Sequence, residues 1–92
     1  MNNKLNYTAS ILKTLGHPIR VGIIMKIHEN HILSVTEIQE LLNISQPVIS
    51  LHLGILKKKG IISSSKKGKQ SLYFIQKKSI IQVIQILYYD SN

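Results

Sequence analysis

Hydrophobic residues between positions 44 and 62 recur with the period of an α-helix. Ile49, Leu53 and Leu56 fall on one face, and the opposite face carries mainly short, weakly polar or cationic side chains, at Pro47, Ser50, Leu51, Gly54 and Lys58. A helix with so slim an outer face suits insertion into the DNA major groove, because bulk there would hold the backbone away from the base edges. A surface helix of a small bundle would show the same pattern.

Both ends of this helix carry boundary signals. We expect the side chain of Ser45 to cap the first turn. Pro47 suits that turn, because its missing N–H has no intrahelical partner to lose. Lys57, Lys58 and Lys59 crowd the last turn, where cations favour the negative end of the helix dipole. Gly60 can then take the left-handed conformation that ends a helix.

Two further helices are predicted earlier in the chain, at positions 5–15 and 18–29. The second is apolar on more than one side, which predicts a central, largely buried helix. Arg20 lies inside it, and we expect an ion pair with Glu37 or Glu40; the alternative is a surface arginine whose charge reaches solvent. The first helix carries a single stripe, formed by Leu5, Thr8, Ala9, Leu12 and Leu15.

The segment that follows predicts a helix-turn-helix. A turn at positions 30–31 and a minimal strand at 32–35 precede a third helix, which opens at Thr36 and Glu37. Asn43 can close that helix in a left-handed conformation. About three turn residues then lead into the helix described first, which is the spacing of a helix-turn-helix.

After Gly60 the apolar period changes to two, which predicts a β-hairpin over positions 61–75. Its tip is a glycine turn flanked by Lys66, Lys67 and Lys69. A hairpin that follows a helix-turn-helix is a wing. We expect its lysines to contact DNA phosphates, although lysine-rich turns are also common as plain solvated turns.

A last helix, predicted at positions 77–89, is apolar over far more than one stripe. A domain of this size cannot hide so much apolar surface against its own core. We therefore expect a second copy of the chain to cover it, together with the first helix. The residues expected at this dimer interface are Leu5, Leu12, Ile80, Ile81, Ile84, Leu87 and Tyr88.

These elements predict a mainly α fold with a small β-hairpin wing, a winged helix-turn-helix in the order α-α-(short β)-α-α-β-β-α. We expect residues 1–92 to form one DNA-binding domain. The helix-turn-helix would span about 36–59, the wing about 61–75, and the dimerisation helices about 5–15 and 77–89.

The distribution of charge along the chain indicates what kind of partner this fold binds. Twelve Lys and Arg residues against four Asp and Glu give a formal charge of +8. Between Leu41 and Tyr89 there is no acidic residue, whereas eight of the twelve basic residues lie there. Charge that served solubility alone would be scattered, so the segregation favours double-stranded DNA over an anionic membrane surface.

Other classes of protein and site receive no support. The chain has no cysteine, which excludes disulfides and thiolate metal sites. No apolar run reaches signal-peptide or membrane-span length, so a cytoplasmic protein is the simplest expectation. His28 and His31 are three apart, but a turn is predicted after Glu29 and a site needs three or four converging ligands, so we expect no metal site and no cofactor. No phosphate-binding loop, nucleophile–base pair or carboxylate dyad is visible, so we expect no enzyme.

Three segments resemble the ArsR-type winged helix-turn-helix repressors of bacteria and archaea. LKTLGHPIRVGII is similar to that family's L-x-x-L-x-x-P-x-R-x-x-I/L opening. VTEIQELLNISQPVISLHLGILKKKGII resembles its two DNA-binding helices, with S-Q-P/S-x-V-S-x-H-L-x-x-L-x-x-x-G-L/I-V/I. GKQSLYFI resembles the G-R/K-x-x-x-Y-x-L strand of its wing. The likeness covers roughly positions 11–75.

This resemblance implies a promoter-binding repressor, with a homodimer held by the first and last helices. The positions matching the family's DNA-facing residues are Ser45, Gln46, Val48, Ser50, Leu51 and His52, with Lys67 and Lys69 on the wing. Two features depart from the family. Neither of its common metal sites is present, because positions 36–42 lack cysteine and the last helix offers only Asp90, so the effector is unknown. Leu51 replaces a residue that is often polar, and it can instead meet thymine methyl groups.

The expected contacts divide into two kinds. Gln46 and Ser50 are the candidates for base edges, because glutamine pairs well with adenine. His52 lies nearer the apolar face, where a bond to backbone or phosphate is the more natural expectation. The phosphate contacts are expected from Lys57, Lys58, Lys66, Lys67 and Lys69. The alternative function is a winged-helix module for protein–protein assembly that binds nucleic acid without sequence preference.

Overall fold

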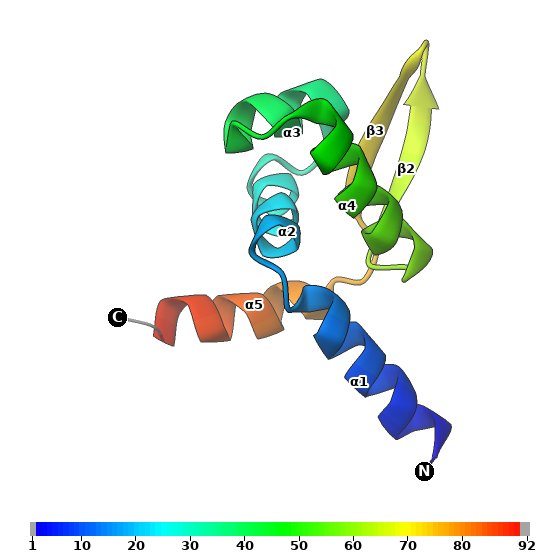
Figure 1. The fold of residues 1–92 in the computed structure, drawn as a ribbon, viewed down its shortest axis with the longest axis vertical. Helices are drawn as coiled ribbons and strands as arrows, with labels where there is room; N and C mark the ends of the chain where they lie inside the picture. The colour runs from blue at the N-terminus through cyan, green and yellow to red at the C-terminus, as the bar shows by residue number, and fades with distance from the viewer. Residues whose placement is uncertain (1, 91–92) are drawn as a thin grey trace.

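Five helices and three strands make up the computed structural model of the chain, which describes residues 2–90. Figure 1 shows their arrangement, with α1 and α5 at one end of the molecule and the hairpin tip at the other. No helix among the described residues is both long and apolar enough to cross a bilayer. In chain order the elements are α1 (Asn3–Leu15), α2 (Pro18–Asn30), β1 (Leu33–Ser34), α3 (Val35–Leu42), α4 (Gln46–Lys58), β2 (Ile62–Lys67), β3 (Gln70–Ile75) and α5 (Ser79–Asp90).

The winged helix-turn-helix predicted from the sequence is confirmed. α3 and α4 are joined by three residues, and Asn43 takes the left-handed conformation expected of it, at φ 54°. Gly60 likewise has φ 73° just beyond the end of α4. The turn between α3 and α4 contains Asn43 in place of a glycine, because asparagine tolerates positive φ better than most residues.

Two local predictions at the helix starts are wrong. α3 begins one residue before Thr36, because Ser34 and Glu37 form a capping box: the Glu37 backbone N–H donates to Ser34 Oγ, and the Ser34 N–H donates to the Glu37 carboxylate. Ser45 is the N-cap residue of α4, but its side chain forms no capping hydrogen bond. The Ser45 hydroxyl is left exposed at the start of the helix.

The expected ion pair of Arg20 with Glu37 or Glu40 is also wrong. Glu37 is held by its own capping box, and Arg20 points instead toward α4 and the end of α1. Its Nε donates to His52 Nδ1 over 3.2 Å, and one terminal nitrogen donates to the carbonyl of Thr14 over 3.1 Å. Charge alone suggested a carboxylate partner, whereas the fold supplies neutral acceptors.

The hairpin of β2 and β3 is part of a three-stranded antiparallel sheet in the order β1-β3-β2. The minimal strand β1 pairs with β3, where Leu33 is opposite Tyr73. Ile62 is opposite Ile75 at the base of the hairpin, and both are buried. This pairing ties the wing to the segment that begins the helix-turn-helix.

The core lies where α2 meets α3, α4 and the base of the sheet. Ile23, Ile24 and Ile27 of α2 have no solvent exposure, as expected for a central helix. From α4, Leu53 is nearly inaccessible, and Ile49 and Leu56 are fully buried. α1 buries Ile11, Thr14 and Leu15 rather than the whole predicted stripe. Each fully buried aliphatic side chain typically contributes roughly 1.5–3 kcal/mol to folding. Rotation of α4 about its axis would expose its buried side chains, so its orientation is strongly fixed.

Candidate nucleic-acid interface

The outer face of α4 is exposed along its whole length. Leu51 is 62% exposed and Val48 is 36% exposed, which is unusual for aliphatic side chains in a helix whose other face is fully buried. A Cβ added at Gly54 would meet no atom of the chain within 4 Å. The exposed residues of this face are Gln46, Pro47, Val48, Leu51, Gly54 and Lys58, with Ser50 half-buried beside them.

Gln46 and Ser50 are brought together one helical turn apart. The Gln46 Nε2 group donates to Ser50 Oγ over 2.9 Å. This bond restrains the amide of an exposed side chain that would otherwise rotate freely. The second amide hydrogen and the carbonyl oxygen of this exposed side chain remain available to a partner.

The wing carries a cluster of lysines at its tip. Lys67 is opposite Gln70 in the register, so Gly68 and Lys69 form the turn, and Gly68 has the positive φ of 64° that the turn requires. Lys66, Lys67 and Lys69 are all exposed. In Figure 1 the tip projects beyond the body of the molecule, on the same side as the start of α4.

Lys57 and Lys58 lie at the other end of α4, near the base of the wing (Figure 1). Lys57 Nζ donates to Ser64 Oγ of β2 over 2.8 Å, a contact that the sequence did not predict. Lys58 is exposed. The five lysines expected to contact phosphate therefore form two groups, three at the wing tip and two at its base.

His52 does not lie on the exposed face. Only 6% of its surface is accessible, and its ring packs against His17 in a tilted arrangement, with centroids 4.5 Å apart. Its Nδ1 accepts the hydrogen bond from Arg20. Burial, together with the neighbouring His17 and Arg20, lowers the pKa of His52 below its ordinary value. The expectation that His52 contacts DNA is corrected: the side chain is directed inward and helps to hold α4 in place.

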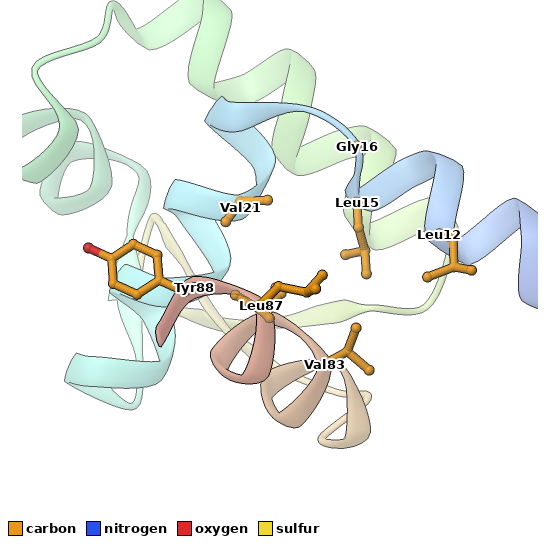
Figure 2. Close-up of a pocket in the computed structure, with 8 residues that line it drawn as sticks. Leu12, Leu15, Gly16, Val21, Val83, Leu87 and Tyr88 are labelled. Carbon is orange, nitrogen blue, oxygen red and sulfur yellow. The ribbon is translucent and has the colours of Figure 1, made fainter. Parts of the chain in front are cut away.

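A second exposed face is apolar and lies on α1 and α5. Figure 2 shows Leu12 and Leu15 of α1 pointing toward Val83 and Leu87 of α5 across a groove. Ile80, Ile81 and Ile84, which we expected at a dimer interface, are instead buried within the single chain. The exposed apolar residues of the two helices are Leu5, Tyr7, Leu12, Val83, Ile86, Leu87, Tyr88 and Tyr89.

Sequence reasoning missed the contacts that hold the interface in position. Arg20, His17 and Thr14 come together beneath α4, and Ser64 holds Lys57. The sequence held one signal for the first group: His17 and Arg20 lie at the start of α2, a helix predicted to be largely buried, so their polar groups need partners within the fold. No three histidine or acidic side chains within residues 2–90 converge as metal ligands do.

Comparison with known proteins places this geometry in a family. The family profile described as "Bacterial regulatory protein, arsR family" matches residues 17–64. The chain is 33% identical to the biofilm growth-associated repressor of Xylella fastidiosa over 88 residues, covering 96% of this chain and 76% of that protein.

Solved structures agree with this. The crystal structure of the transcriptional repressor BigR from Xylella fastidiosa has a TM-score of 0.88 at 31% identity, covering 97% of this chain and 90% of that one. A homodimeric winged helix-turn-helix domain from Mycobacterium bovis has a TM-score of 0.80 at 19% identity, with 92% of this chain and 78% of that chain covered, which shows the shared fold. The chain belongs to the ArsR family of bacterial regulatory proteins, a family of DNA-binding transcriptional repressors rather than of enzymes.

Proposed function

We propose that the protein is a dimeric repressor that binds one operator sequence, with α4 in the major groove and the wing on the neighbouring backbone. The observation that carries this proposal is the placement of two exposed elements. The start of α4, where Gln46, Pro47 and Val48 are exposed, lies at the same end of the molecule as the lysine tip of the wing. Such a protein would act in the cytoplasm by occupying a promoter, with residues 1–92 as one DNA-binding unit.

Base recognition would rest on Gln46. Ser50 engages one hydrogen of its amide, and the remaining hydrogen and the carbonyl oxygen match the N7 acceptor and N6 donor of adenine. Because Ser50 already restrains the amide, less side-chain entropy is lost on binding. Val48 and Leu51 would provide apolar contact to thymine methyl groups, and Ser45 can donate to a phosphate at the start of the helix.

Phosphate contacts would supply affinity without sequence preference. Lys66, Lys67 and Lys69 would follow the backbone beside the groove, and Lys58 would reach it from the other end of α4. Lys57 contributes charge as well, but its bond to Ser64 gives it a second role in bracing the wing against α4. His52 would act only through the position of α4, because it is buried.

The dimer would form through the exposed apolar face of α1 and α5. An isologous interface places the same patch of both copies in contact, and exposed apolar surface of this extent usually marks an interface. Leu5, Leu12, Leu87 and Tyr88 remain candidates for it, joined by Val83 and Ile86. The similar domain from Mycobacterium bovis is homodimeric. Two recognition helices would then lie about one DNA turn apart, roughly 34 Å.

The direct test of sequence-specific repression is a selection from random duplex DNA at near-physiological salt. We expect an enriched inverted repeat with half-sites spaced by about one helical turn, because a two-fold dimer presents two copies of α4. Uniform retention of all duplexes would instead support the assembly module with non-specific nucleic-acid binding.

Replacing Lys67 and Lys69 with alanine should weaken operator binding and flatten its dependence on salt. Each lost phosphate contact should reduce the slope of log affinity against log salt by about one. The control removes the same charge from Lys13 and Lys78, which are exposed but distant from the wing tip. Equal slopes for the two double variants, measured by fluorescence anisotropy, would show that the wing is not the docking surface.

Gln46→Ala should relax preference at one base pair in each half-site, by about 1–3 kcal/mol of discrimination. Ser50→Ala should cause a smaller loss at the same base pair, because it frees the amide without removing it. Competition between the selected operator and a version with that pair exchanged measures both effects. An unchanged preference in Gln46→Ala would contradict the assigned contact.

Leu87→Glu should convert the dimer to a monomer, because it places a charge in the apolar face, and should weaken operator binding by removing the second half-site contact. Leu87 is 67% exposed in the single chain, so the fold should survive. Sedimentation measures whether the variant is a dimer or a monomer, and circular dichroism measures whether it is folded. Gln76→Glu adds the same charge at an exposed position outside α1 and α5 and should remain dimeric. A dimeric Leu87→Glu would place the interface elsewhere.

A further inference from the structure

Arg20 bridges two elements that have different roles in DNA binding. Its terminal nitrogen donates to the carbonyl of Thr14, at the end of α1, over 3.1 Å. Its Nε donates to His52 Nδ1, in the middle of α4, over 3.2 Å. A single guanidinium therefore connects the helix of the apolar face to the helix of the DNA-binding face, and its fork geometry makes both bonds at once.

The end of α1 that Arg20 holds is part of the apolar face. Thr14 is 5% exposed and is fixed by its own bond from Oγ1 to the carbonyl of Ser10. The next residue, Leu15, lines the groove between α1 and α5 (Figure 2). A second link runs parallel to the first, because Lys59 Nζ donates to Ser10 Oγ over 2.6 Å. Displacement of α1 would therefore change the position of α4.

The bridge requires a neutral His52. Its Nδ1 accepts a hydrogen bond, so the ring proton must sit on Nε2. Protonation of Nδ1 would direct an N–H at the Arg20 N–H and place two positive charges together in a site that is almost closed to water. A proton on His52 Nδ1 and the hydrogen bond from Arg20 Nε exclude each other.

The surroundings of His52 oppose its charged form. From α2 it faces Arg20, and from the turn before α2 it faces His17, whose Nδ1 accepts the Ile19 N–H at the start of that helix. Among residues 2–90, no carboxylate of α3 and no lysine of α1 or β2 forms a hydrogen bond with the His52 ring. Burial, His17 and Arg20 all lower its pKa.

Building on the proposed function, we propose that Arg20 couples the dimer face to the recognition helix through His52, and that protonation of His52 releases this coupling and weakens specific DNA binding. The ligand is a proton, and Arg20 and His52 are positioning residues that do not touch DNA. α4 remains packed by its apolar face when the bridge opens, so the change is a shift of its alignment rather than unfolding.

The direction with pH follows from the neutral state. Above the ordinary histidine pKa of about 6.5 the bridge is intact and specific affinity is independent of pH. As the pH falls through the lower pKa of His52, the bridge opens and specific affinity declines. Non-specific binding should change in the opposite direction, because added positive charge favours any polyanion. The ratio of specific to non-specific affinity therefore isolates the effect.

The test compares the parent protein with His52→Asn, using the selected operator and a scrambled duplex at about pH 7.5 and about pH 5.5. Asparagine can accept the Arg20 bond at either pH through its side-chain oxygen. We expect the operator preference of the parent to fall about threefold to tenfold at the lower pH, as expected for the loss of the one hydrogen bond that aligns α4. The preference of His52→Asn should stay constant. Circular dichroism at both pH values checks that each protein is folded.

A second variant tests the bridge without titration. Arg20→Lys keeps the charge but cannot hold both acceptors, so at about pH 7.5 it should lose operator preference by a similar factor while retaining non-specific binding. A parent-like preference in folded Arg20→Lys, a parent preference unaffected by pH, or an equal decline in His52→Asn would each overturn the inference and leave the repressor intact. Absence of any operator preference in the parent at both pH values would overturn the proposed function itself, and this inference with it.

Discussion

The burial of one face of α4 against α2 is the interaction on which the rest of the structure depends. Ile49, Leu53 and Leu56 are almost fully inaccessible, and they meet a helix whose own isoleucines are equally buried. Turning α4 by one residue would expose this face at a cost of several kcal/mol, at roughly 1.5–3 kcal/mol for each side chain. A single good base contact is about 1–3 kcal/mol. The core, and not the DNA, therefore decides which side chains of α4 face outward.

Polar contacts refine this orientation where apolar packing leaves freedom. Ser50 restrains Gln46 on the outer face, Ser64 holds Lys57 beside the wing, and Arg20 holds His52 beneath the helix. Each is a neutral or singly charged hydrogen bond, worth little to stability by itself but strongly directional. Burial of apolar side chains fixes the rotation of α4, whereas hydrogen bonds fix the positions of its polar side chains and connect it to α1.

Local features of the fold were predictable because they depend on short-range sequence patterns. The two faces of α4, the positive φ of Asn43 and the hairpin around Gly68 follow from periodicity and turn chemistry. Contacts between distant segments were not. The partner of Arg20 lies 32 residues away, and no pattern distinguishes a histidine acceptor from a carboxylate there. α5 is apolar on most sides, so only its tertiary contacts show that Ile80, Ile81 and Ile84 belong to the core.

The central claim is that the outer face of α4 and the wing tip form one DNA-binding surface. The most direct measurement is amide NMR of the isotope-labelled protein during titration with a short duplex that carries the selected operator. We predict that the largest shifts occur along α4 from Gln46 to Leu51 and at the wing tip from Lys66 to Lys69, with small changes along the outer side of α5. Shifts concentrated on α1 and α5, with α4 and the wing unaffected, would contradict it.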